Sequence, residues 1–182
     1  MTIAIAPFDG LCGFRPLAEI SHFLTNVSAL RKLISESAAK EFESSVKGRE
    51  TSEKADDMEK NKEALQTAFS ALMNASKDSI VAAAKELVMS AEKDGESFAG
   101  GGGPSNGGKE LADLVVRLNG QFEGDIGLFV LFFLNYVKLQ VGEAMFLKAD
   151  DIHAYLSGGK LPIASHVPLL KYIRYNGVHG IL

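Results

Sequence analysis

Apolar residues recur at three- and four-residue spacing along much of the chain, which is typical of helices with one buried face. This spacing predicts helices over about residues 16–26, 59–74, 77–93 and 109–122. Pro16 suits the start of the first helix, because its missing N–H costs nothing at a first helical position. Ser28 is predicted to cap a further helix, and the charged stretch 47–59 indicates a loop or a solvated helix start. The middle of the chain is therefore predicted to be helical.

Shorter apolar runs toward the two ends predict strands. The nine-residue run Ile126–Leu134 predicts a buried strand, Gln140–Glu143 a turn and Ala144–Leu147 a second short strand. At the N-terminal end, Met1–Ala6 alternates and predicts a strand, whereas Pro7–Pro16 is rich in turn residues and then starts a helix. The order of strand, helical block and hairpin is that of a helical segment inserted into a β domain.

Glycine dominates residues 95–108, which predicts a flexible connection. Within it, Gly103–Lys109 fits the G-x-x-x-x-G-K pattern of phosphate-binding loops. However, Glu110 stands where that motif needs Ser or Thr for magnesium, and a predicted helix rather than a strand precedes it. We therefore interpret the stretch as a linker. A nucleotide binder is the alternative, and it fails if the protein does not bind ATP in the presence of magnesium.

The composition is that of an ordinary folded protein, since 46% of the 182 residues are hydrophobic and 23% are charged. The net charge of −4 and the scattered basic residues argue against nucleic acid as a partner. No apolar run reaches the roughly 18–20 residues that cross a membrane. The one cysteine, Cys12, cannot form an internal disulfide, and the N-terminus lacks a signal-peptide pattern, so we expect a cytoplasmic location.

His153 is the main candidate for chemistry, because it follows a turn and a short apolar strand, as ligands do in small β-barrels. A lone histidine is more often a satisfied core or surface residue, and a zinc centre needs about three protein ligands and an open position. Cys12 is interpreted as an inert small hydrophobe, since only Arg15 nearby could activate it. Asp150 and Asp151 are interpreted as turn formers. The remaining histidines show no ligand-like spacing: His22, His166 and His179.

Two segments, PFDGLCGFRP (Pro7–Pro16) and GDIGLFVLFFLNYVKLQVGEAMFLKADDIHAYLSG (Gly124–Gly158), resemble the type I phosphomannose isomerases, the zinc-dependent mannose-6-phosphate isomerases of eukaryotes. The resemblance covers about residues 1–158. Val141 and Ile152 depart from it mildly, because the family often has proline at both positions. The resemblance implies an α+β fold, in which a helical insertion domain of about four to five helices is attached to part of a cupin-like jelly-roll β-barrel.

The same resemblance implies how the chain is divided. The implied parts are a barrel strand and turn (1–14), a helical domain with the Gly-rich linker (15–122), barrel strands with the ligand-type histidine (123–158) and a divergent tail (159–182).

The resemblance also implies an activity, the interconversion of mannose 6-phosphate and fructose 6-phosphate, which supplies mannose and GDP-mannose. In the family, a proton moves between C1 and C2 through an enediol while zinc polarises the carbonyl and holds the sugar oxygens. His153 matches the family's last zinc ligand, and Tyr155 matches a tyrosine that lines the sugar pocket. These two residues are the site that the resemblance implies.

Other parts of the family's site have no counterpart in this sequence. A Gln-x-His pair and a Glu supply the other three zinc ligands in the family, and all of them precede the segment at which this chain starts. Arg174 stands in Arg-Tyr-Asn-Gly and does not match the catalytic arginine of the family's Asn-x-x-Arg-Ala-Gly segment, so no catalytic residue is assigned. The likeness ends at Gly158, as an alternative reading frame or a retained intron would give. We therefore expect a truncated isomerase that is inactive by itself and binds zinc poorly.

A second hypothesis is a non-catalytic helical interaction module, derived from the isomerase, that binds a partner such as the full-length enzyme. It predicts a soluble helical protein. A truncated barrel instead exposes unpaired strands, which predicts self-association or aggregation.

Overall fold

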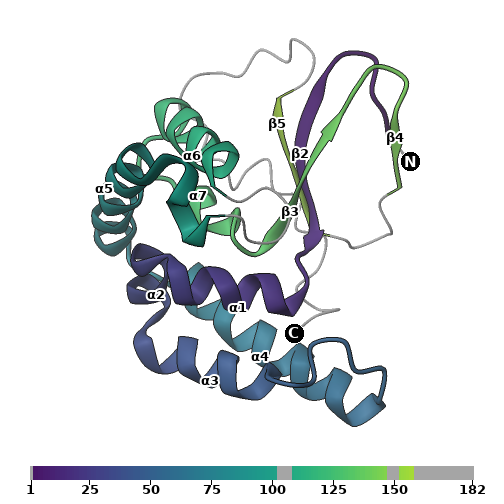
Figure 1. Cartoon of the computed structure of the whole chain (residues 1–182), viewed down its shortest axis with the longest axis vertical. Coiled ribbons are helices and arrows are strands. Elements are labelled where there is room, and N and C mark those ends of the chain that lie inside the picture. The colour runs from purple at the N-terminus through teal and green to yellow at the C-terminus, as the bar shows by residue number, and fades with distance from the viewer. Residues whose placement is uncertain (1, 102–107, 147–151, 158–182) are drawn as a thin grey trace.

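The computed structural model describes residues 2–101, 108–146 and 152–157, and it places a group of helices beside a small set of strands (Figure 1). The helices are α1 (Leu17–Asn26), α2 (Ser28–Ile34), α3 (Glu36–Val46), α4 (Ala55–Met73), α5 (Lys77–Asp94), the 3-10 helix η1 (Gly95–Gly100), α6 (Lys109–Gln121) and α7 (Gly127–Val130). The strands are β1 (Thr2–Ile3), β2 (Phe8–Phe14), β3 (Leu134–Leu139), β4 (Ala144–Met145) and β5 (His153–Ser157). Within these ranges no helix combines the length and the apolar character needed to cross a membrane.

β2 is the central strand of a three-stranded sheet, with β3 on one side and β5 on the other, both antiparallel to it. β1 and β4 form a separate antiparallel ribbon at the side of the sheet that faces away from the helices (Figure 1). The interpretation of residues 7–16 as turn-rich is therefore wrong, because most of them form the strand at the centre of the sheet.

Two glycines explain why this strand resembles a turn in the sequence. A Cβ atom on Gly10 would lie 2.9 Å from the ring of Phe8, so glycine leaves room for that ring to lie over the strand. Gly13 has a φ of 62° where the pairing with β3 shifts at a β-bulge, and glycine adopts this conformation without strain. Nδ2 of Asn135 donates across the bulge to the carbonyl oxygen of Phe14 at 2.9 Å. The bulge is thus held from the neighbouring strand.

The apolar run that follows α6 is helical where a strand was predicted. Asp125 Oδ1 accepts a hydrogen bond from the backbone N–H of Gly127 at 2.7 Å, and α7 begins there. Further turns carry the chain to β3, which begins only at Leu134. The side chains from Ile126 to Leu134 are buried, each at most 6% exposed. A run that is buried all round has no polar face, so periodicity cannot distinguish a helix from a strand.

The described residues between 17 and 121 form six α-helices, α1 to α6, where four to five were expected. The additional helix is α3. It begins after Ser35, whose φ of 81° breaks the helical path and whose side chain accepts a hydrogen bond from the backbone N–H of Ala38 at 3.3 Å. The prediction that Ser28 is a helix cap is wrong: Val27 holds the cap position, and the Ser28 hydroxyl donates to Glu86 of α5 at 2.6 Å.

The prediction of a flexible connection over residues 95–108 is wrong for its first part. Residues 95–100 form η1, in which Phe98 is 1% exposed and Ala99 is 5% exposed. A Cβ atom on Gly100 would lie 2.7 Å from Nε2 of His22, so this backbone packs directly against α1. The buried ring of Phe98 therefore anchors η1, although the glycine-rich composition of this segment suggests flexibility. Residues 102–107, with most of the G-x-x-x-x-G-K pattern, lie outside the described residues.

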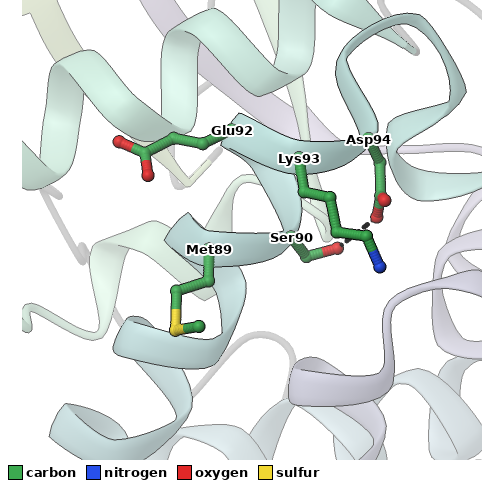
Figure 2. A pocket seen from close by; sticks show the side chains of 5 residues that line it. All are labelled: Met89, Ser90, Glu92, Lys93 and Asp94. Carbon is green, nitrogen blue, oxygen red and sulfur yellow. Dashed lines mark hydrogen bonds between the residues drawn. The ribbon is translucent and has the colours of Figure 1, made fainter.

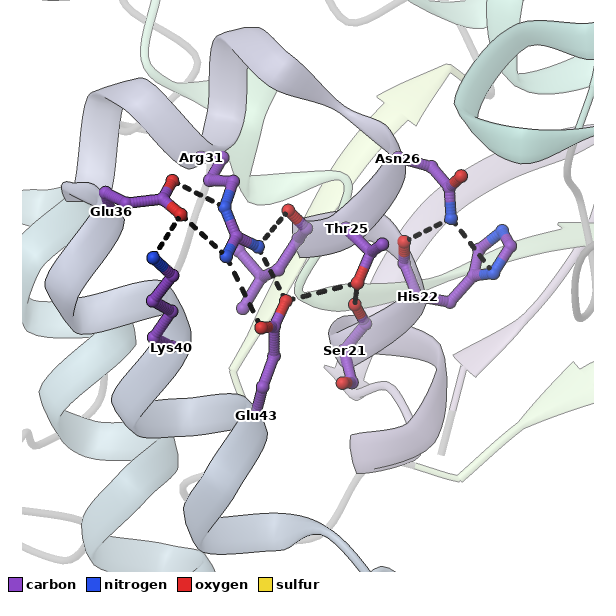
Figure 3. Close-up of polar contacts among 9 residues, drawn as sticks. Ser21, His22, Thr25, Asn26, Arg31, Glu36, Lys40 and Glu43 are labelled. Atoms are coloured by element: carbon purple, nitrogen blue, oxygen red, sulfur yellow. Dashed lines mark hydrogen bonds and ion pairs between the residues drawn. The ribbon is translucent and has the colours of Figure 1, made fainter.

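Arg31 of α2 connects three helices (Figure 3). Its guanidinium donates to the carboxylates of Glu36 and Glu43 of α3, both at 2.6 Å, and to the Leu24 carbonyl of α1 at 3.0 Å. The hydrogen bonds to Glu36 and Glu43 raise the pKa of Arg31 above its usual value. The same contact with Arg31 lowers the pKa of Glu36. The network fixes how α1, α2 and α3 lie against one another.

Candidate functional site

The three-stranded sheet has two different faces. Leu11, Ala154 and Leu156 are at most 3% exposed and belong to the core shared with the helices. Side chains alternate along a strand, so Phe8, Cys12, His153 and Tyr155 lie on the opposite face. We call this second face, defined by those four residues, the site face.

Three rings stand in a row on the site face. The Phe8 ring meets the Tyr155 ring edge-on, with centroids 5.4 Å apart and an interplanar angle of 70°. The Tyr155 ring is tilted against the imidazole of His153, with centroids 5.6 Å apart. Tyr155 is 37% exposed, and among the described residues its hydroxyl makes no hydrogen bond. The structure thus brings the two site residues of the sequence analysis together and leaves the tyrosine hydroxyl open to a ligand.

His153 lies directly opposite Cys12 in the β2–β5 register. An imidazole and a thiol are both zinc donors, but a zinc centre needs about three or four protein ligands. In the part of the chain that the structure describes, no group of three or more His, Cys, Asp or Glu side chains could hold a metal ion. The described residues therefore do not make a complete zinc centre.

Of the other candidates, His22 lies in the described part of the chain, away from the site face. His22 lies on α1, and its Nε2 is 2.9 Å from the Ala99 carbonyl oxygen of η1, so it joins these two elements. Asp150 and Asp151 lie outside the described residues. Three residues of the tail also lie outside the described residues: His166, Arg174 and His179.

Arg15 joins the sheet to the helices at the point where the chain enters and leaves the helical domain. It is 2% exposed, and its Nη1 donates to Glu19 at 3.0 Å while its Nε donates to the Leu131 carbonyl at 3.1 Å. Its guanidinium also lies over the ring of Phe23, 5.1 Å from the centroid. Burial lowers the pKa of Arg15, and the hydrogen bond to Glu19 opposes that shift.

Neither the position of Phe8 nor the Arg15–Glu19 pair was predicted from the sequence. Phe8, Gly10 and Cys12 alternate with Asp9 and Leu11, which is the period of a strand. That alternation is the signal that could have placed Phe8 beside Tyr155. The i,i+4 spacing of Arg15 and Glu19 could have indicated an ion pair, but no local pattern shows that the pair is buried.

A surface groove of about 450 Å³ lies between α6 and β3, near the end of the G-x-x-x-x-G-K pattern. Its charges form ion pairs: Lys109 with Asp113, Arg117 with Asp9, and Glu110 with Lys138. Glu110, which replaces the Ser or Thr of a phosphate-binding loop, is thus engaged with a lysine. This arrangement does not favour the nucleotide binder.

A second depression, of about 520 Å³, lies on α5 (Figure 2). Five residues of this single helix line it: Met89, Ser90, Glu92, Lys93 and Asp94. The Ser90 hydroxyl donates to Asp94 at 2.7 Å. It brings together no side chains from different elements, so we assign it no chemistry.

Fold and site together define an α+β protein. A helical domain is attached to antiparallel strands that carry a histidine and a tyrosine on the site face. A family model described as phosphomannose isomerase type I, helical insertion domain, matches residues 33–134. The chain belongs to the type I phosphomannose isomerase family. Its strands are part of the cupin-type barrel of these enzymes.

Known proteins similar to this chain are isomerases of the same family. The mannose-6-phosphate isomerase of Aspergillus fumigatus is 60% identical over 163 residues, which cover 87% of this chain and 35% of the relative. The enzyme of Schizosaccharomyces pombe is 43% identical over 158 residues, with the same coverage. The chain therefore spans about a third of the length of these relatives.

Solved structures show the same likeness. The mannose 6-phosphate isomerase of Salmonella typhimurium, bound to fructose 6-phosphate and zinc, superposes with a TM-score of 0.55 at 28% identity. The match covers 86% of this chain and 32% of that structure. Related structures also contain zinc, so zinc is the metal of the family.

Proposed function

We propose that this chain is part of a mannose-6-phosphate isomerase and that it does not catalyse the reaction by itself. The 60% identity to an isomerase of which the chain covers 35% is the observation that supports both halves of this proposal. In the complete site, His153 is one zinc ligand and Tyr155 lines the sugar pocket. Their common face and the 5.6 Å between their rings support these roles, because both side chains can reach one ligand.

By itself, the chain should bind zinc only weakly. One histidine and one thiol supply fewer donors than a zinc centre requires, and an isolated imidazole binds the metal weakly. Without the metal, the polarisation of the sugar carbonyl is lost. What the chain can contribute is a wall of the sugar pocket.

The purified 182-residue protein should bind less than stoichiometric zinc after dialysis and should not isomerise mannose 6-phosphate in a coupled assay. The full-length Aspergillus fumigatus enzyme is the positive control. A graft of residues 1–157 into that enzyme should restore activity. In the graft, His153→Gln should weaken zinc binding by more than about a hundredfold, because changing a residue that only orients a zinc ligand already costs roughly tenfold to a hundredfold. His22→Gln is the matched control and should keep its zinc. Stoichiometric zinc together with turnover in the isolated chain would sink the proposal.

The acidic net charge and the single cysteine support a cytoplasmic, reducing location and argue against nucleic acid as the partner.

A second function, self-association, is favoured by the β1–β4 ribbon. Four large side chains in or beside its two strands are more than half exposed: Ile3, Ile5, Val141 and Phe146. Among the residues that the structure describes, the outer edges of the ribbon are also unpaired, which favours pairing with another chain. A soluble interaction module predicts a helical monomer instead, and circular dichroism with size exclusion distinguishes the two.

We expect the oligomer fraction in size exclusion to rise with protein concentration, because exposed apolar strands associate. The double substitution Ile5→Lys with Phe146→Lys should shift the protein to monomer. Met89→Lys is the matched control, since Met89 is 69% exposed but lies on α5, away from the ribbon. If the Met89 variant dissociates equally, or if the wild-type protein is monomeric throughout, self-association through the ribbon is wrong.

A further inference from the structure

Tyr155 lies on a strand at the edge of the sheet, and its ring is placed by other rings. Within the described part of the chain it contacts the rings of Phe8 and His153 and forms no hydrogen bond through its hydroxyl. The tyrosine is also 37% exposed. The orientation of its hydroxyl therefore depends on how firmly its two neighbours hold the ring.

Phe8 is held in place by its own strand and by a small apolar cluster. It lies on the central strand, opposite Leu139 of β3. It packs against a small buried cluster of Ala4, Leu139 and Met145, each at most 8% exposed. The Phe8 ring is thus held by contacts other than the one with Tyr155.

Gly10 is what allows Phe8 to reach Tyr155. Gly10 pairs with Tyr155 in the register of β2 and β5, two residues beyond Phe8. A Cβ atom at this position would lie 2.9 Å from Cε1 and Cζ of Phe8, and 3.1 Å from the backbone oxygen of Ala154. Any larger residue would push the Phe8 ring away from the strand. The Ala154 backbone oxygen, 3.1 Å from the Cβ position, leaves the added side chain little room to shift instead.

We propose that Phe8 is a positioning residue that, with Gly10, fixes the Tyr155 ring so that its hydroxyl faces a sugar-phosphate ligand. This inference rests on the proposed function for the role of Tyr155. Edge-on aromatic pairs add about 0.5–1.5 kcal/mol beyond their buried area. Loss of the pair should therefore weaken a ligand that depends on the ordered tyrosine by about twofold to tenfold.

The test uses NMR on the full 182-residue chain, with the Tyr155 ring signals assigned by comparison with a Tyr155→Phe variant. In the absence of sugar, Phe8→Leu should shift and broaden the Tyr155 ring signals, because the neighbouring ring current and the contact are both lost. Gly10→Ala should do the same although Phe8 is still present. Phe8→Tyr keeps a ring at this position and should restore the wild-type pattern.

Ligand binding is followed on the Tyr155 signals in the graft of residues 1–157 into the Aspergillus fumigatus enzyme, with mannose 6-phosphate as the ligand and inorganic phosphate as the control ligand. Phe8→Leu should weaken the mannose 6-phosphate response about twofold to tenfold, and Phe8→Tyr should not. Unchanged Tyr155 signals in both Phe8→Leu and Gly10→Ala would overturn the positioning role. If the wild-type Tyr155 signals ignore mannose 6-phosphate, or respond equally to phosphate, the sugar pocket itself is wrong. The spectrum without sugar then still reports the Phe8 contact, so the two failures are distinguishable.

Discussion

Glu19→Gln should lower the free energy of unfolding by about 3–5 kcal/mol, because it removes the carboxylate that lies 3.0 Å from Nη1 of the buried Arg15. The side chains of Arg15 and Glu19 are 1% and 11% exposed, so water cannot replace the lost carboxylate. The substitution keeps the shape of the side chain but replaces the charged carboxylate with a neutral amide. The effect should spread to both ends of the helical domain, since Arg15 also binds the Leu131 carbonyl before β3.

Urea unfolding followed by far-UV circular dichroism measures this loss. The control is Asp113→Asn, which breaks an ion pair of the same i,i+4 spacing between Lys109 and Asp113 on α6. That pair is about two-thirds exposed, at 65% and 64%, so its loss should cost no more than about 0.5 kcal/mol. Equal losses in the two variants would show that burial adds nothing to the Arg15–Glu19 pair.

The limits of α5 and α6 could be predicted because the apolar stripes of these two helices are clear. The spacing predicts a helix over about 77–93, and α5 runs from Lys77 to Asp94. The last long helix was predicted over about 109–122, and α6 runs from Lys109 to Gln121. These helices lie with one face on the core and the other toward water. That asymmetry gives the three- and four-residue spacing of apolar residues from which both helices were predicted.

The wrong assignments share a physical cause, which is that tertiary surroundings outweigh the local pattern. Residues 126–134 carry no polar face because the core surrounds them, so their sequence is equally compatible with strand and helix. In Phe8–Phe14, glycine indicates a turn locally, whereas in the fold Gly10 makes room for an aromatic ring from its own strand. Phe98 likewise anchors η1 through contacts that lie far away in the sequence.

The site could be predicted only in part, for a related reason. His153 and Tyr155 are two residues apart on one strand, so they share a face whatever their surroundings. Their neighbours Phe8 and Cys12 come from the other end of the chain, and only the register between β2 and β5 brings them close. The register between two strands that are distant in the sequence is set by the whole fold. It cannot be predicted from the pattern of residues in either strand alone.

Phe132 lies at the centre of the core that joins the helices to the sheet, and Phe132→Ala should cost about 3–5 kcal/mol of unfolding free energy. It is 0% exposed, and its ring centroid lies 5.4 Å from that of Phe23 on α1 and 6.5 Å from that of Phe98 in η1. Truncation removes these contacts and leaves a cavity among rings on separate elements, which cannot all move inward to fill it.

Phe146→Ala is the matched control, because the same truncation at a residue that is 73% exposed removes little packing. It should change the free energy of unfolding by no more than about 0.5 kcal/mol. Phe132→Leu should lie between the two, since leucine fills part of the cavity. Urea unfolding of the three variants gives the order directly. If Phe132→Ala and Phe146→Ala unfold at the same urea concentration, then Phe132 is not part of the packed core. In that case the run from Ile126 to Leu134 would not connect the helical domain to the sheet as the structure has it.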